Sequence, residues 1–301
     1  ADPRTDAIID PIPDLRAAEC SNGAPSARNL IVTVFGDLLG PGREVSVQQL
    51  TELLAGFGVN ERLVRTSLSR IAADGLLAAR AVGRRSFYRI APDASTTFAN
   101  ADRRIYRGDD AVWDGSWTIV VLDGGESTAS RRAKLRRELT WAGLGTVAPN
   151  VLASPVVAPD TVTDVIARVG GFDHVLVTRS HVVEAEGTLG HKVLMRRSAD
   201  VDEVERGYHD FADRFERFDA DVLARLDDTE ALKARLLLVS TFRRVALADP
   251  QFPSTLVPAG WSGRRARAAA RRVYAAVAPA ADRHATRVLG DPVTTDPHRF
   301  P

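Results

Sequence analysis

The sequence contains a single cysteine, Cys20, among its 301 residues. One thiol cannot form a disulfide within the chain, and it cannot supply a cysteine cluster for a metal. No apolar run approaches the roughly 18–20 residues that a membrane-spanning helix needs. The first residues are rich in proline and charge and have no apolar core, so we expect no secretory signal there. These absences favour a soluble protein of the reducing cytoplasm, without contact to a membrane.

Net charge is almost absent as well, at +1, but the arginines are unevenly distributed. Between Arg62 and Arg107 lie ten arginines and only three acidic residues. A basic segment in a near-neutral chain indicates a polyanionic partner for that segment, and the alternative is a solvated basic face. The local excess therefore favours nucleic acid as the partner of this part of the chain.

Three helices are predicted before and within this basic segment. Apolar residues at helical spacing predict the first helix within residues 26–40. Ser46 and Gln49 stand at capping-box spacing where a second helix would begin. Asn60 is a favourable N-cap for a third helix, and Gly75 is a favourable residue to end it.

A predicted hairpin follows the third helix directly. Two β-prone runs, 76–82 and 86–90, are joined through a glycine and two arginines. Helix, helix, tight turn, helix and two-stranded wing is the order of a winged helix-turn-helix. We therefore predict this DNA-binding domain over residues 26–92, preceded by a flexible arm over residues 1–25.

The third predicted helix has two chemically different sides. On a helical wheel Val64, Leu68 and Ile71 share one side with Ser67. The opposite side carries arginine, threonine and serine. An arginine fork can engage O6 and N7 of guanine together, while hydroxyl groups suit phosphates or base edges. We predict DNA contacts from this side and from the wing tip, namely from Arg62, Arg65, Thr66, Ser69, Arg84 and Arg85.

The remaining chain predicts two further domains and an α+β fold class. Residues 111–185 follow the order β-α-β-β-α-β, which is that of a small ferredoxin-like domain, and a linker over 93–110 precedes them. Residues 186–290 predict a helical C-terminal domain whose last helix breaks near Pro279. The tail over 291–301 is expected to be disordered.

Several strings, in order along the chain, resemble the PaaX-type family of repressors of phenylacetate catabolism. They are "SARNLIVTVFGDLLG", "FGVNERLVRTSLSRIAADGLL", "GRRSFYRI", "RRIY", "WDGSWTIVVLD", "LRRELTWAGLGTVAPNVLASP" and "FRRVALADPQFPSTLVPAGWSGRRA". The resemblance spans about residues 26–290, although the N-terminal arm and much of 180–205 carry no string of this kind. It implies a DNA-binding repressor with no cofactor and a central domain similar to the Cas2 ferredoxin-like fold. It also implies release from DNA by an aromatic acyl-coenzyme A, with phenylacetyl-coenzyme A as the usual ligand of the family and other aromatic acyl thioesters as alternatives.

Such an effector would need cations for its phosphates and apolar walls for its acyl group. The C-terminal third offers both kinds of side chain. An aromatic stripe at helical spacing also fits a packed core, and adjacent arginines can be solvated or paired with acids, so that alternative stays open. The candidate ligand-binding residues are Tyr208, Arg243, Arg244, Trp261 and Arg264.

The likeness to Cas2 raises an enzymatic alternative, a metal-dependent nuclease. Asp123 ends the first predicted strand of the central domain, where a carboxylate could help to hold a divalent ion. It also stands beside Gly124-Gly125, a common composition for a turn. The six histidines are scattered and predict no metal site. We therefore predict a repressor rather than an enzyme.

We also expect a homodimer. A single recognition helix reads only a few base pairs, and two half-sites related by a two-fold axis raise specificity. The central and C-terminal segments have apolar faces to spare for such a contact, whereas the small winged helix uses most of its own.

Overall fold

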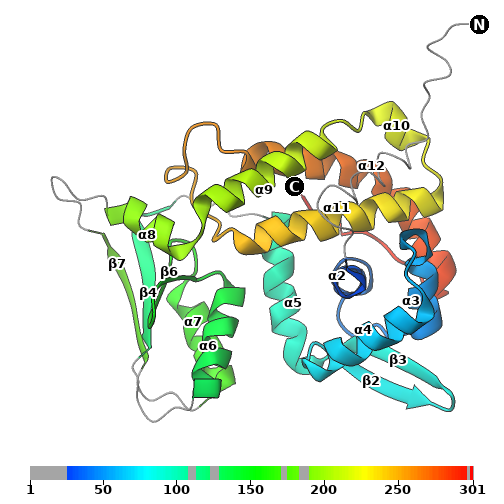
Figure 1. Cartoon of the computed structure of the whole chain (residues 1–301), viewed down its shortest axis with the longest axis horizontal. Helices are drawn as coiled ribbons and strands as arrows, with labels where there is room; N and C mark the ends of the chain where they lie inside the picture. Colours follow the sequence, from blue (N-terminus) through cyan, green and yellow to red (C-terminus); the bar gives the residue numbers. More distant parts are fainter. Residues whose placement is uncertain are drawn as a thin grey trace, which may run out of the picture. The chain divides into compact units, whose positions relative to one another are not determined.

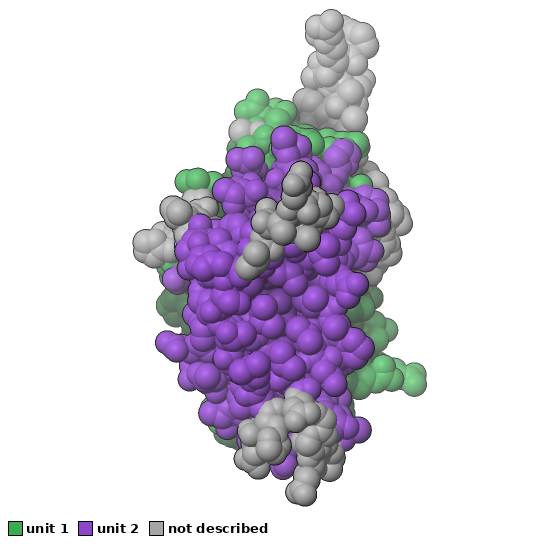
Figure 2. Space-filling view, turned by 90° about the vertical axis from the view of Figure 1, so that its left-hand side faces the viewer, with its two compact units in different colours: residues 1–96, 210–243, 265–301 green, residues 97–209, 244–264 purple. Residues whose placement is uncertain are grey.

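The computed structural model describes residues 26–107, 113–122, 129–170, 175–182, 190–296 and 299–300. These residues form two compact units, coloured separately in Figure 2. Unit 1 contains Ala1–Thr96, Asp210–Arg243 and Arg265–Pro301, and unit 2 contains Thr97–His209 and Arg244–Arg264. The units therefore do not coincide with the predicted boundaries, because the C-terminal helices contribute to both. The predicted arm over 1–25 lies outside the described residues.

The three predicted N-terminal helices are present (Figure 1). Helix α2 (Ala27–Val34) continues into a π-helical turn, η1 (Phe35–Leu39). Helix α3 (Val47–Leu53) begins with the predicted capping box of Ser46 and Gln49, which is confirmed in both directions. After the 3₁₀ turn η2 (Ala55–Phe57), helix α4 (Glu61–Ala73) begins at its predicted cap, where the Asn60 side chain accepts a hydrogen bond from the Leu63 amide at 2.9 Å.

The predicted hairpin is confirmed: β2 (Leu77–Val82) and β3 (Arg85–Ile90) pair antiparallel. Val82 pairs with Arg85, so the turn has two residues. Gly83 adopts a φ of +58°, the left-handed conformation that such a tight turn requires. A third strand, β1 (Val45–Ser46), pairs with β3 and was not predicted, because two residues carry no periodic signal. We refer to α2, α3, α4 and this sheet as the winged-helix segment.

The predicted linker over 93–110 is helical as far as the structure describes it. It contains the 3₁₀ turn η3 (Pro92–Ala94), helix α5 (Ser95–Asp102) and a π-helical turn, η4 (Arg103–Arg107). Ile105 and Tyr106 are buried, so the end of this segment belongs to the packed part of the chain.

Unit 2 contains the predicted βαββαβ order. Its strands are β4 (Ser116–Leu122), β5 (Gly145–Ala148), β6 (Val151–Ser154) and β7 (Val175–His181), in the antiparallel order β5-β6-β4-β7. Helices α6 (Ala129–Ala142) and α7 (Pro159–Val169) share a core with one face of the sheet, built around Val120, Leu139 and Val162. Helix α7 begins with Pro159 at its first position, directly after Ala158.

The other face of this sheet packs on α8 (Gly190–Ser198), a helix that was not predicted. Trp117, Ala153 and Met195 form the centre of that contact. Gly145 of β5 lies so close to α8 that a Cβ atom there would stand 2.1 Å from the Ser198 carbonyl oxygen. A glycine is therefore required at this crossing.

Four further helices complete the chain: α9 (Val201–Phe215), α10 (Ala220–Ala224), α11 (Asp228–Ala248) and α12 (Gly263–Leu289). The predicted break at Pro279 is wrong, because α12 runs through that residue. Ala278 and Ala281 on either side are buried, so tertiary packing holds the helix together where one backbone hydrogen bond is missing. Within the described residues, no helix has the length and apolar character to cross a membrane.

The described residues after Gly290, a segment expected to be disordered, pack within unit 1. The Thr295 amide donates to Asp282 Oδ2 at 2.8 Å, and the Val293 amide donates to Thr286 Oγ1 at 2.9 Å. Phe300 is buried, with its ring centre 5.3 Å from that of Tyr274. The partners of these residues lie on α12, seven or more residues earlier in the chain, so the composition of the tail itself could not predict the contacts.

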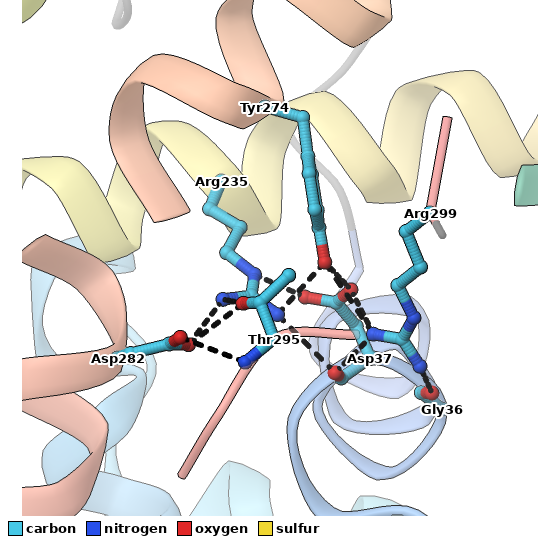
Figure 3. Close-up of polar contacts among 7 residues, drawn as sticks. All are labelled: Gly36, Asp37, Arg235, Tyr274, Asp282, Thr295 and Arg299. Carbon is cyan, nitrogen blue, oxygen red and sulfur yellow. Dashed lines mark hydrogen bonds and ion pairs between the residues drawn. The ribbon is translucent and has the colours of Figure 1, made fainter. Parts of the chain in front are cut away.

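A buried polar network joins this tail to α2 and to the C-terminal helices (Figure 3). Arg235 and Arg299 lie on either side of the Asp37 carboxylate, at 2.6 Å from Oδ2 and 2.8 Å from Oδ1. Arg235 also contacts Asp282 at 2.6 Å, and the Tyr274 hydroxyl donates to Asp37 Oδ1 at 2.9 Å. Two guanidinium groups thus balance two carboxylates.

The environment of Arg235 keeps that side chain charged. Burial alone would lower the pKa of Arg235, but the Asp37 carboxylate raises the pKa above its ordinary value. Burial and the same carboxylate raise the pKa of the Tyr274 hydroxyl. The tyrosine therefore stays protonated and acts as a donor to Asp37.

Asp37→Ala should lower the free energy of unfolding by about 3–5 kcal/mol, because it removes the carboxylate that the buried Arg235 and Arg299 guanidinium groups share. Urea denaturation followed by circular dichroism measures this loss. Glu61→Ala, which removes a carboxylate from an exposed ion pair with Arg65, is the matched control and should leave the midpoint almost unchanged. Equal midpoints for the two variants would contradict the structural role of the network.

Candidate nucleic-acid interface

Helix α4 separates a packing face from an exposed face. Val64, Leu68 and Ile71 are completely buried, and α4 packs on both α2 and α3. Ser67 is buried on the same face. Because this face is anchored on two helices, the orientation of the exposed face is set by the core of the winged-helix segment.

All six predicted DNA-contacting residues are exposed. Four of them lie along α4 and two lie at the tip of the β2–β3 hairpin, which packs beside α4 (Figure 1). The residues are Arg62, Arg65, Thr66 and Ser69 on the helix, and Arg84 and Arg85 on the wing. This arrangement offers a protruding helix for a groove and separate cations for the neighbouring phosphates.

Two of these side chains already have partners on α4. Arg65 contacts Glu61 Oε1 through Nε at 2.8 Å and through Nη2 at 2.5 Å. The Thr66 hydroxyl donates to the Arg62 carbonyl at 2.9 Å, so in this geometry its outward side offers only an acceptor. Arg65 is more than half exposed, and an exposed pair of this kind is weak enough to exchange for a phosphate or a base.

Some of the arginines between Arg62 and Arg107 are not available to bind a polyanion. Arg80 of β2 forms an ion pair with Glu44, and Arg104 is buried in unit 2. Arg104 donates to the carbonyl oxygens of Trp141, Leu247 and Asp249 at 2.9–3.0 Å, and thus satisfies the C-terminal ends of α6 and α11. Burial lowers the pKa of Arg104, and the nearby Asp249 opposes that shift. A count of arginines therefore overstates the basic surface.

The candidate ligand-binding residues fall into different environments. Tyr208 is buried and donates to Asp249 Oδ2 at 2.9 Å, and its ring lies 6.0 Å from that of Trp261. Arg244 and Arg264, also in unit 2, are exposed. Arg243 belongs to unit 1, where its guanidinium donates to the Asn29 side chain of α2. The structure therefore brings Tyr208 and Trp261 together as packed neighbours, and it places the Arg243 guanidinium against Asn29 of α2.

The nuclease alternative depends on Asp123, which lies outside the described residues. Where the structure is described, no group of three or more His, Cys, Asp or Glu side chains could hold a metal ion.

Three family models match successive parts of the chain. The model described as PaaX-like protein matches residues 26–94, and the model of the PaaX protein central Cas2-like domain matches residues 110–190. The model of the PaaX-like protein C-terminal domain matches residues 199–287. Together the three models cover most of the sequence.

Relatives of known name and structure were also found. The chain is 32% identical over 265 residues to the transcriptional repressor PaaX of Escherichia coli, covering 86% of this chain and 83% of the relative. A solved structure, that of the uncharacterized protein Rv0674 from Mycobacterium tuberculosis, aligns over 88% of this chain and 100% of its own, with 23% identity and a TM-score of 0.47.

Tyr208→Phe should lower the free energy of unfolding by about 1–3 kcal/mol, because the buried Asp249 carboxylate loses a hydrogen-bond donor. Chemical denaturation measures the change. Tyr88→Phe, which alters a half-buried tyrosine of the wing, is the matched control. An unaltered stability for Tyr208→Phe would argue that this hydroxyl is not a packing group and would return Tyr208 to the ligand candidates.

Proposed function

The chain belongs to the PaaX family, and from that premise we propose that it is a transcriptional repressor that binds operator DNA and performs no catalytic step. The observation that carries this proposal is the exposed face of α4 beside a wing tipped by Arg84 and Arg85. We further propose that it acts in the cytoplasm, where operator DNA is accessible to it.

The geometry of the winged-helix segment supports different roles on DNA for α4 and for the wing. The exposed arginines and hydroxyl groups of α4 suit base edges in the major groove. Arg84 and Arg85, on a tight turn at the end of a hairpin, suit backbone phosphates, which contribute affinity without reading sequence. We propose that two copies bind as a homodimer to two half-sites, because one helix reads too few base pairs for an operator.

We propose that an aromatic acyl-coenzyme A, with phenylacetyl-coenzyme A as the first candidate, releases the protein from an operator of phenylacetate catabolism. The ligand must bind the DNA-incompetent form more tightly, and a swing from 1:99 to 99:1 needs a preference of about 5.5 kcal/mol. Free coenzyme A carries the same phosphates, so the acyl group must supply the discrimination through burial of its ring, at about 25 cal/mol per Å². Arg244 and Arg264 are the candidates for the phosphates.

Contacts inside unit 1 support a coupling between the C-terminal helices and the winged-helix segment. Lys233 of α11 lies over the Phe57 ring, in the turn between α3 and α4, at 5.6 Å from the ring centre. The Gln49 side chain of α3 donates to the Leu289 carbonyl of α12 at 3.0 Å. A ligand that shifts α11 or α12 would therefore act on α3 and on the turn that leads into α4.

Arg65→Ala should weaken operator binding by about 1–3 kcal/mol and reduce sequence preference, as expected when a base contact is lost. Arg84→Ala should weaken binding to all sequences alike and flatten the slope of log affinity against log salt by about one unit, as for one phosphate contact. Mobility-shift titrations at several salt concentrations measure both effects. Arg168→Ala, an exposed arginine of α7 in unit 2, serves as the control. Wild-type affinity in a folded Arg62/Arg65 double variant would rule out α4 as the recognition helix.

Phenylacetyl-coenzyme A should dissociate the operator complex, whereas phenylacetate and free coenzyme A should not. Arg244→Ala and Arg264→Ala should keep operator affinity but lose the response, as measured by calorimetry for binding and by mobility shift for release. Arg243→Ala is unsuitable for this purpose, because Arg243 supports α2. Arg271→Ala, an exposed arginine of α12, is the control and should respond normally. Release by free phenylacetate, or normal release of both variants, would contradict the proposed ligand site.

A further inference from the structure

Among the described residues, large apolar side chains are exposed at four positions: Leu63, Val82, Leu176 and Val193. Both of those in unit 1 lie on elements proposed to contact DNA. Leu63 of α4 is 45% exposed and stands in the first turn, the part of a recognition helix that contacts base edges. Isolated exposed apolar residues are common on protein surfaces, so the position of Leu63 matters more than its exposure alone.

The backbone at Leu63 is fixed. Its amide is the one that the Asn60 cap holds, and the next residue, Val64, is completely buried against the core. The side chain of Leu63 therefore cannot turn inward without unwinding the first turn of α4. Its exposed neighbours at helical spacing are Thr66 and Arg70, three and seven residues further on.

These surroundings match DNA better than an apolar protein partner. A protein that docked on Leu63 would need a continuous apolar patch, but the adjacent exposed groups are cationic or hydroxyl-bearing: Arg62, Thr66 and Arg70. Cations beside a single apolar side chain fit a major groove, where phosphates border the base edges and thymine displays a methyl group.

We infer that Leu63 contacts the C5-methyl group of a thymine and so specifies a T·A pair at one position of each half-site. This inference rests on the proposed DNA-binding function. Leucine can neither donate nor accept a hydrogen bond, so it cannot recognise the amino and carbonyl groups of the bases. Thymine is the base that presents an apolar group in the major groove, and cytosine at the same place lacks that methyl.

Replacing thymine by uracil removes this methyl group and leaves the Watson–Crick edge intact. The full-length protein would first select a duplex from a random-sequence pool, and each thymine of that duplex would then be replaced by uracil in turn. Wild-type protein should lose affinity about fourfold at one position of each half-site, the effect of burying one methyl group. Leu63→Ala should bind thymine and uracil equally at that position and keep the wild-type response at the others.

Val193→Ala, which shortens an equally exposed apolar side chain on α8, is the matched control and should keep the wild-type ratio at every position. Because Leu63 is exposed and alanine favours helices, the variant should unfold at the wild-type temperature. A thymine-to-uracil ratio unchanged by Leu63→Ala, or no effect of uracil on wild-type protein, would overturn the inference while leaving DNA binding intact. Failure to enrich any sequence would instead overturn the proposed function and this inference with it.

Discussion

Unit 1 depends on a buried ion pair between Asp37 and Arg235, whose side chains are both fully inaccessible to solvent. Taking two charges out of water costs several kcal/mol for each ion, and close contacts are needed to offset that cost. Here Tyr274, Asp282 and Arg299 supply the remaining hydrogen bonds, so the network is balanced in charge. Such a network contributes a fixed geometry more than net stability. It sets one arrangement of α2 against α11 and α12.

The network around Asp37 also helps to fix the position of α4, the helix proposed to contact DNA. The turn η1, which continues α2, carries Asp37. Because α2 packs on α4, the position of α4 is tied to residues near the C-terminus of the chain. Arg43, just before β1, donates to the Pro292 carbonyl at 2.6 Å and adds a second attachment. The winged-helix segment is thus part of a larger compact unit, which gives the C-terminal helices a physical route to the proposed operator contacts.

Capping residues and hydrophobic periodicity predicted the helices and strands, which depend on residues close together in the sequence. Capping by Ser46 and Asn60, and the alternation of helical and strand patterns, identified the N-terminal helices, the wing and the βαββαβ order. The helical wheel also predicted which side chains of α4 are exposed, although their contact with DNA stays a prediction. The division into units could not be predicted, because its contacts join Asp37 to partners 198 and 262 residues away. One signal was available: a lone carboxylate inside the apolar run "VTVFGDLL" needs a buried partner.

The pair of Glu61 and Arg65 adds a further constraint on the proposed interface. Without DNA, the carboxylate neutralises Arg65 and directs its guanidinium back toward the start of α4. Near a phosphate backbone, the same carboxylate is repelled, so binding requires Arg65 to exchange this partner for a better one. Two hydrogen bonds from Arg65 to guanine compensate for the lost ion pair with Glu61, whereas a contact with a single phosphate compensates for less of it. At the proposed interface, the pair would therefore weaken contacts with random sequence more than contacts with an operator. It would shift α4 toward specificity, while the proposed phosphate contacts of Arg84 and Arg85 would supply affinity.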